Sequence, residues 1–149
     1  MAVRTAYSIG FTKHSARDFF ESLNRAGIER LVDVRLNNVS QLAGFAKRDD
    51  LAYFLELICG VEYMHEPLLA PTAELLDAYR KRRITWETYE RRFSDLIRER
   101  SIGDMFAPEF FDRRTVLLCS EHAPDQCHRR LVLEYLQRVW EGDLVIKHL

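Results

Sequence analysis

The sequence predicts a single α/β domain over residues 1–149, with a mainly parallel sheet of about five strands and helices on both faces. Short β-prone segments alternate along the chain with segments whose apolar residues recur at helical spacing. A length of 149 residues is ordinary for one domain, and no linker, repeat or low-complexity tract divides it. Apolar residues make up 47% and charged residues 30%, which allows a buried core and excludes general disorder.

The first part of the chain predicts a strand, a helix and a second strand. Thr5–Gly10 is β-prone and ends at a glycine that allows a tight turn. Ser15 and Asp18 have the spacing of a helix-capping pair, and apolar residues at helical spacing follow until Gly27. The mostly apolar run Ile28–Val34 suits a buried strand.

The middle of the chain predicts three helices and one strand. Asp49 or Asp50 is expected to cap a helix that closes at Gly60, and Val61–His65 is expected to form the third strand. Two further helical patterns follow between residues 72 and 100. They make the connection to the next strand atypical for this fold class.

The last part of the chain carries the clearest signals. Thr115–Leu118 is a continuous β-prone run, and residues 129–140 have one apolar face at helical spacing. Asp125 precedes this helix and is a natural N-cap, Gly142 ends it, and Leu144–Ile146 predicts a final strand. The order of the strands in the sheet does not follow from this pattern.

Charge and cysteine usage narrow the kind of protein. A formal net charge of -1 argues against a dedicated, sequence-independent nucleic-acid coat protein but leaves room for a local basic cleft. Three cysteines without framework spacing, and no N-terminal signal pattern, predict free thiols and a cytoplasmic location. No apolar run approaches the ~18 residues of a membrane span, so no membrane partner is expected. The oligomeric state does not follow from the sequence.

Ligands of open parallel sheets bind beyond the carboxyl ends of the strands. The predicted strand ends open onto residues 10–15, 33–38, 65–69 and 119–130. Polar and reactive side chains gather in these connections: His14, Asp33, Arg35, His65, Cys119, Glu121, His122, Cys127, His128 and Arg129. The sequence therefore predicts a functional site at this edge of the sheet.

The start of the last predicted helix is the strongest part of that site. With Asp125 as N-cap, Cys127, His128 and Arg129 would occupy the first turn, where free N–H groups and the helix dipole favour an anion. Such a position can lower a cysteine pKa from about 8.5 to roughly 3.5–7.5. The same N–H groups could instead bind a phosphate or carboxylate, with Arg129 or Arg35 as a bidentate clamp. These two interpretations compete, because a thiolate and a bound anion use the same dipole.

The other candidates take supporting roles. Cys119 lies at a strand end, where a thiol is often a core residue, and is the second candidate nucleophile. Glu121 and His122 are potential acid–base groups, and Asp33 is a potential orienting partner. The candidate ligand-binding residues are Arg35, His65, His128, Arg129 and His14.

A metal or cofactor is not expected. Cys119, His122, Cys127 and His128 are zinc-type ligands, but the paired spacing of structural zinc motifs is missing. Adjacent residues at a helix start are also expected to point in different directions. The Walker A, dinucleotide-binding and nucleophile-elbow motifs are absent from the sequence.

A basic and aromatic stretch offers a different surface. Arg80–Arg83, with Tyr79, Trp86 and the basic pair at residues 91–92, could form a face for a nucleic-acid backbone. Trp86 and Tyr89 fit helical core spacing equally well, and charge runs are usually solvated. Packing is the favoured interpretation of this stretch.

Four segments together resemble the landmarks of the domain-of-unknown-function family DUF488. They are Tyr-Ser-Ile-Gly-Phe at residues 7–11, Leu-Val-Asp-Val-Arg at 31–35, Gly-Val-Glu-Tyr-Met-His at 60–65, and Leu-Leu-Cys-Ser-Glu-His-Ala-Pro-Asp-Gln-Cys-His-Arg at 117–129. The resemblance spans nearly the whole chain, and its closing motif is specific.

The resemblance implies an α/β fold but no biochemical activity. It directs attention to a set of motif residues: Asp33, Arg35, Cys119, Glu121, Cys127, His128 and Arg129. The chain departs from the family pattern where Leu68–Pro71 replaces a usual Leu-Gly-Gly. Two glycines that would bring backbone close to a ligand are absent there.

Three classes of function remain open. The first is a small cysteine-dependent enzyme or thiol sensor acting on an anionic ligand, phosphorylated, nucleotide or nucleic acid, with Cys127 as nucleophile facing Arg35 and Arg129. The second is a non-catalytic binding module for nucleic acid or a phosphorylated partner, which the family resemblance associates with DNA repair and in which residues 80–92 matter as much as the cysteines. The third is a Cys/His metal-binding protein.

Overall fold

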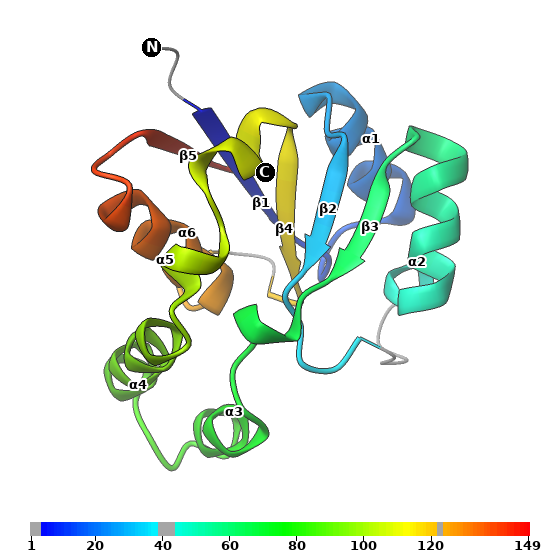
Figure 1. The fold of residues 1–149 in the computed structure, drawn as a ribbon. Helices are drawn as coiled ribbons and strands as arrows, with labels where there is room; N and C mark the ends of the chain where they lie inside the picture. The colour runs from blue at the N-terminus through cyan, green and yellow to red at the C-terminus, as the bar shows by residue number, and fades with distance from the viewer. Residues whose placement is uncertain (1–3, 39–43, 122–123) are drawn as a thin grey trace.

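The computed structural model describes residues 4–38, 44–121 and 124–149. Its centre is a five-stranded, wholly parallel sheet with the strand order β3-β2-β4-β1-β5 (Figure 1). The predicted α/β fold class with a parallel sheet is confirmed. The strand order adds what the sequence pattern left open, because it places β4 between β2 and β1.

Each strand lies where the sequence predicts one. The strands are β1 (Arg4–Gly10), β2 (Arg30–Asp33), β3 (Glu62–His65), β4 (Thr115–Cys119) and β5 (Leu144–His148). All five residues of the central β4 are buried, whereas the edge strands β3 and β5 contain exposed residues. Burial on both faces explains why β4 is the most continuous apolar run in the sequence.

One face of the sheet is covered by helices from the first half of the chain (Figure 1). These are α1 (Ala16–Ala26) and α2 (Arg48–Phe54), which continues as a π-helical segment, Leu55–Cys59. A 3-10 turn, Gly44–Ala46, precedes α2. Phe19, Phe20 and Leu23 of α1 pack against Ile9 of β1 and Leu118 of β4 in one apolar core.

The other face is covered by the later helices, α4 (Trp86–Glu99), α5 (Ile102–Met105) and α6 (His128–Val139) (Figure 1). The helix α3 (Ala73–Arg80) lies beyond the carboxyl ends of the strands, and 3-10 turns form at Pro67–Leu69 and Pro108–Asp112. A second apolar core joins the two layers through residues such as Leu117, Phe93 and Leu131.

The predicted helix start at Ser15 is confirmed by its cap, and one of the helices predicted between residues 72 and 100 has a cap of the same kind. The Ser15 hydroxyl accepts a hydrogen bond of 3.1 Å from the backbone N–H of Asp18, and Gly27 ends α1 with a φ of 67°. Thr85 caps α4 in the same way, through the N–H of Thr88. These side chains satisfy N–H groups that have no partner within the helix.

Two other predicted caps were wrong. The N-cap of α2 is Lys47, and Asp49 and Asp50 lie in the first turn, where their carboxylates face the positive end of the helix dipole. The N-cap of α6 is Cys127 rather than Asp125, because the segment before it closes a turn in which the N–H of Cys127 donates to the carbonyl of Pro124. Residues 102–112, for which no element was predicted, form α5 and a 3-10 turn.

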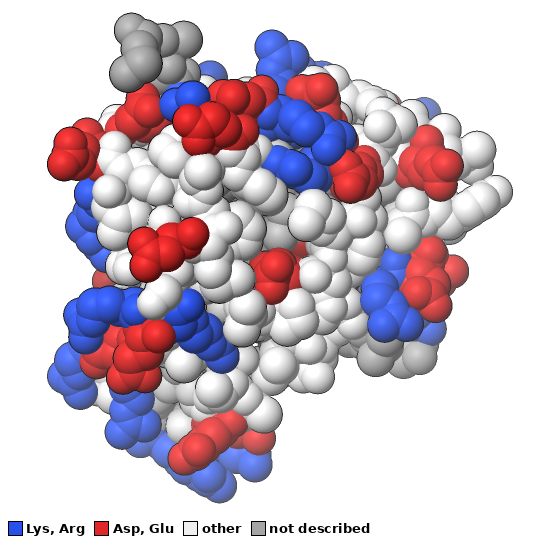
Figure 2. Space-filling model, viewed as in Figure 1, with Lys and Arg blue, Asp and Glu red and all other residues white. Residues whose placement is uncertain are grey.

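Charged side chains are spread over the surface in both signs (Figure 2). In this view, Lys and Arg gather over α3 and α4, with acidic side chains among them. In the part of the chain that the structure describes, no helix is both long enough and apolar enough to cross a membrane.

Candidate functional site

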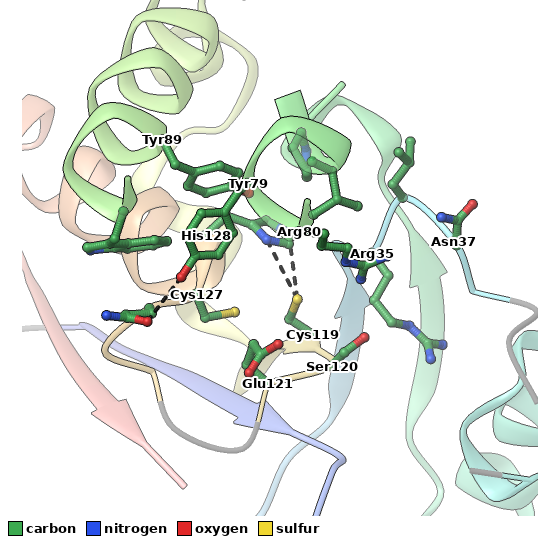
Figure 3. Close-up of a pocket in the computed structure, with 15 residues that line it drawn as sticks. Arg35, Asn37, Tyr79, Arg80, Tyr89, Cys119, Ser120, Glu121, Cys127 and His128 are labelled. Atoms are coloured by element: carbon green, nitrogen blue, oxygen red, sulfur yellow. Dashed lines mark hydrogen bonds between the residues drawn. The ribbon is translucent and has the colours of Figure 1, made fainter. Parts of the chain in front are cut away.

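A pocket of about 70 Å³ opens at the carboxyl ends of β2 and β4, on the side covered by α3, α4 and α6 (Figure 3). Its lining comes from four separate parts of the chain: Arg35, Leu36, Asn37, Pro71, Leu76, Tyr79, Arg80, Trp86, Tyr89, Cys119, Ser120, Glu121, Gln126, Cys127 and His128. The predicted place of the site, beyond the carboxyl ends of parallel strands, is where this pocket lies.

One wall of the pocket is held in place by a buried ion pair. Arg35 donates to both carboxylate oxygens of Asp33, from Nε at 2.9 Å and from a terminal nitrogen at 2.8 Å. The two side chains are 3% and 0% exposed. The hydroxyl of Tyr63 donates to the same carboxylate at 2.6 Å, and the ring nitrogen Nε2 of His65 lies 2.9 Å from the carbonyl oxygen of Arg35. Asp33 and His65 therefore position Arg35 and do not line the pocket themselves.

The surroundings of Asp33 also change the acidity of the Tyr63 phenol. Burial of the Tyr63 phenol, followed by its hydrogen bond to the Asp33 carboxylate, raises the pKa of Tyr63 well above its usual value. A phenol that stays protonated remains a donor, so it stabilises the ionised carboxylate that pairs with Arg35.

The floor of the pocket is formed by Cys119 and His128 (Figure 3). The sulfur of Cys119 lies 3.6 Å from Nδ1 of His128 and 3.8 Å from Nε2. Nε2 of His128 lies 2.7 Å from the carbonyl oxygen of Val34, to which it donates. A ring nitrogen that donates to a carbonyl carries the hydrogen, so Nδ1 is left to face the sulfur. The ring packs edge-on against Phe93, with centroids 5.4 Å apart.

The two cysteines of the pocket differ in their acidity. A hydrogen bond from the Cys127 thiol lowers the pKa of Cys119, and the backbone N–H groups of Ser120 and Glu121 and the charge of Arg129 act in the same direction against the effect of burial. The same hydrogen bond, together with burial, raises the pKa of Cys127 well above its usual value. The expected low-pKa thiol at Cys127 is therefore wrong, since Cys127 is the donor and Cys119 the acceptor.

The thiols and the imidazole converge, which contradicts the expectation that adjacent residues at a helix start point apart. One ligand atom each from Cys119, Cys127 and His128 lies within 4.8 Å of the others, and all three residues are buried. Cys127 is the N-cap of α6 and has an extended backbone, with φ -138° and ψ 137°. His128 is the first helical residue, and this change of conformation lets the two side chains meet.

Arg129 is not among the residues that line the pocket, but it bonds to one of them, Glu121. The Arg129 side chain is fully buried, with Nε donating to the hydroxyl of Ser8 at 3.1 Å and a terminal nitrogen donating to the carbonyl of Glu121. Gly10 makes this close approach possible, because a Cβ there would lie 1.5 Å from the same carbonyl oxygen. Arg129 is thus a buried structural residue that does not line the pocket.

An aromatic wall completes the pocket. The rings of Trp86 and Tyr89 stack with centroids 5.2 Å apart, and Tyr79 contacts Tyr89 at 5.0 Å. The Tyr79 hydroxyl donates to Oε1 of Gln126 at 3.0 Å, which links α3 to the segment before α6. Arg80 lines the same pocket and is exposed. The sequence predicted packing for these rings, and they form both a packed stack and a pocket wall.

The remaining candidates lie in different places. Glu121 lines the pocket and is exposed, whereas His14 packs against Phe19 of α1, with ring centroids 6.4 Å apart, and is not among the lining residues. His122 lies outside the described residues. Sequence reasoning did not single out several lining residues: Leu36, Asn37, Pro71, Leu76, Ser120 and Gln126. Ser120 and Gln126 lie within the closing motif, and Leu36 and Asn37 lie within the connection after the second predicted strand, so their positions rather than their residue types could have indicated them.

Comparison with known proteins gives a family but no function. Searches of curated proteins and of solved structures found no significant match. A family model described as "Domain of unknown function DUF488" matches residues 15–136, which include Asp33, Arg35, Cys119, Cys127 and His128. The chain belongs to this family, DUF488.

Proposed function

We propose that this protein is a small thiol-dependent enzyme in which Cys119 is the nucleophile and the substrate is anionic. The observation that carries the proposal is the chain of contacts from the Cys119 sulfur to Nδ1 of His128 at 3.6 Å, and from Nε2 of His128 to the Val34 carbonyl at 2.7 Å. A nucleophile next to a base that a third group orients is the arrangement on which cysteine nucleophiles depend.

Each neighbouring group has a role in this proposal. His128 accepts the thiol proton at Nδ1 as the sulfur bonds to an electrophilic atom of the substrate, and returns that proton to the leaving group. Cys127 donates to the Cys119 sulfur. Glu121, which lines the pocket, is a further candidate for proton transfer. His122 is a candidate from the sequence alone, because it lies outside the described residues.

The anionic character of the substrate is inferred from the cations at the pocket. Arg80 lines the pocket and forms no ion pair among the described residues, whereas Arg35 lines it with its charge already paired with that of Asp33, and Glu121 adds a carboxylate. The lining also includes the aromatic side chains Tyr79 and Trp86. A guanidinium binds phosphate or carboxylate through several donors, and an aromatic wall favours a planar group. A phosphorylated compound with an aromatic ring, such as a nucleotide, fits both features.

The test combines site-resolved alkylation with ligand screening. Protein kept in reductant and chelator is treated with iodoacetamide, and modification of each cysteine is followed by peptide mass spectrometry. We expect Cys119 to react before Cys127 and a panel of phosphorylated compounds to contain ligands that slow its modification. The Cys59→Ser variant is the matched control, because Cys59 is absent from the pocket lining. Equal labelling of Cys119 with and without every compound of the panel would contradict the proposal.

A second candidate, a nucleic-acid-binding module, is favoured by a specific observation. None of Arg80, Lys81, Arg82 and Arg83 forms an ion pair among the described residues, whereas Arg4, Arg35, Arg113 and Arg130 do. Arg80 and Arg82 line a hollow beside the pocket, next to Trp86. Four solvated cations near an aromatic ring suit a single-stranded backbone.

This candidate predicts binding of single-stranded oligonucleotides that weakens steeply with added salt. Replacing Arg80, Arg82 and Arg83 together by Gln should reduce the affinity at least tenfold, because phosphate contacts contribute most of non-specific affinity. The matched control replaces Arg17 and Arg25 of α1 by Gln. Binding that is unchanged between low and moderate salt would contradict this function.

A further inference from the structure

The buried group formed by Cys119, Cys127 and His128 has the composition of a metal site. These residues are 6%, 2% and 6% exposed, and their ligand atoms lie within 4.8 Å of one another. Two sulfurs and an imidazole nitrogen are soft ligands that select Zn²⁺ or Cu(I) over the oxygen-preferring Mg²⁺ and Ca²⁺. In the described part of the chain, no other group of three such side chains meets this spacing.

The measured spacing agrees with a tetrahedral site. With Zn–S near 2.3 Å and Zn–N near 2.0–2.1 Å, the sulfur and the nitrogen of a tetrahedral zinc site lie roughly 3.6 Å apart. The Cys119 sulfur lies 3.6 Å from Nδ1 of His128. The sulfur of Cys127 lies within 4.8 Å of both of these ligand atoms, so the three ligands are close enough to share one ion.

The surroundings of the three ligands have the features of an outer coordination shell. Metal-binding histidines usually donate their other ring N–H to a carbonyl or carboxylate, and His128 donates from Nε2 to the Val34 carbonyl at 2.7 Å. The backbone N–H groups of Ser120 and Glu121 donate to the Cys119 sulfur. The bond to the Val34 carbonyl leaves Nδ1 of His128 facing the Cys119 sulfur.

We propose that Cys119, Cys127 and His128 bind one Zn²⁺ ion through both sulfurs and Nδ1, with a fourth coordination position open to the pocket. All three ligands line that pocket, where Arg35 and Arg80 also lie. Three protein ligands with an open position are typical of catalytic or regulatory zinc, whereas structural zinc has four. Two thiolates neutralise the charge of the ion, and each thiol that is protonated beforehand releases a proton on binding.

This site has a consequence for the thiol chemistry proposed above. Zinc and an electrophile require the same sulfur, so bound zinc protects Cys119 from alkylation. The fourth position and the cations of the pocket would then bind an anionic ligand to the metal instead. The metal site and the nucleophile both use the Cys119 sulfur. Metal binding and thiol reactivity can nevertheless be measured separately, because the alkylation is done in chelator.

The experiment titrates the reduced, metal-free full-length protein with Co²⁺ under anaerobic conditions. We expect one equivalent to give the thiolate-to-cobalt charge-transfer band and the intense visible bands of tetrahedral cobalt, and one equivalent of Zn²⁺ to remove both. Cys127→Ser should lower the charge-transfer intensity to about half, because one of two thiolate ligands is lost. The Cys59→Ser variant should leave the spectrum unchanged, and circular dichroism confirms that each variant is folded.

Weak octahedral cobalt bands, or a charge-transfer band that Cys59→Ser reduces as much as Cys127→Ser, would overturn the metal site. If Cys127→Ser does not fold, His128→Ala in the presence of imidazole gives the second measurement, with recovery of the tetrahedral spectrum expected. Rapid alkylation of Cys119 in chelator without any tetrahedral cobalt spectrum leaves the proposed nucleophile standing and removes only the metal. A tetrahedral cobalt spectrum together with a Cys119 that does not react in chelator supports the metal site and contradicts the proposed nucleophile.

Discussion

Asp33 and Arg35 form a two-point ion pair in which both carboxylate oxygens accept, although only one residue separates the two in the chain. The pair is buried at the point where β2 ends, and Asp33 also accepts from Tyr63 of the neighbouring β3. The ion pair thereby holds Arg35 in the wall of the pocket. The Asp33 carboxylate itself is buried, and its hydrogen-bond partners are Arg35 and Tyr63.

Asp33→Asn should destabilise the protein by about 3–5 kcal/mol, because it leaves the buried guanidinium of Arg35 without its counter-charge. Tyr63→Phe removes one hydrogen bond to the same carboxylate and the one that the Tyr63 hydroxyl accepts from Asn38, and it should cost about 1–3 kcal/mol. Urea unfolding followed by circular dichroism measures both. If the two variants lose equal stability, the charge of Asp33 is not what holds Arg35.

The place of the site could be predicted from the sequence because it depends on local rules. Strand ends at Asp33 and Cys119 follow from β-prone runs, and the parallel sheet brings such ends to one edge. The three-ligand group could not be predicted, since it depends on the turn that moves the start of α6 to His128. The periodicity of apolar residues predicts that a helix is present more reliably than it predicts the residue at which the helix begins.

The aromatic wall illustrates a second limit. Tyr79 and Trp86 belong to helices whose path across the carboxyl end of the sheet is set by tertiary packing, so helical spacing alone indicated only that they pack.

The role of Arg129 was predicted as ligand binding for a similar reason. Its position in the motif marks it, but only the folded chain shows that its guanidinium bonds to the Ser8 hydroxyl and to the Glu121 carbonyl.

Arg129→Lys should destabilise the protein by about 2–4 kcal/mol, because an ammonium group cannot reproduce the separate bonds from Nε to Ser8 and from a terminal nitrogen to Glu121. Arg130→Lys is the matched control, since Arg130 is partly exposed and its ion pairs with Glu90 and Glu134 are of the weak surface type. Chemical denaturation measures the difference. A smaller loss for Arg129→Lys than for Arg130→Lys would contradict the assignment.

Gly10→Ala should disturb the pocket as well as the stability. The added Cβ would lie 1.5 Å from the Glu121 carbonyl oxygen, which is backbone and must move with its loop. We expect a loss of about 2 kcal/mol or more and a changed alkylation rate of Cys119, because overpacking shifts neighbouring backbone. Gly44→Ala is the control, since an added Cβ at Gly44 meets nothing within 4 Å. An alkylation rate that is unchanged in Gly10→Ala would show that the loop does not set the position of the thiol.

The order in which the cysteines titrate tests the hydrogen bond between them. In chelator-treated protein, the alkylation rate of Cys119 should rise with pH through an apparent pKa below the usual thiol range, because the thiolate form is stabilised by Cys127 and by the backbone N–H groups of Ser120 and Glu121. Cys59, whose pKa burial raises, should respond only at higher pH and serves as the internal reference. Cys127→Ala removes the largest stabilising contact, so the profile of Cys119 should move to higher pH. Iodoacetamide labelling at several pH values with peptide mass spectrometry gives all three profiles, and faster labelling of Cys127 than of Cys119 would reverse the assigned donor and acceptor.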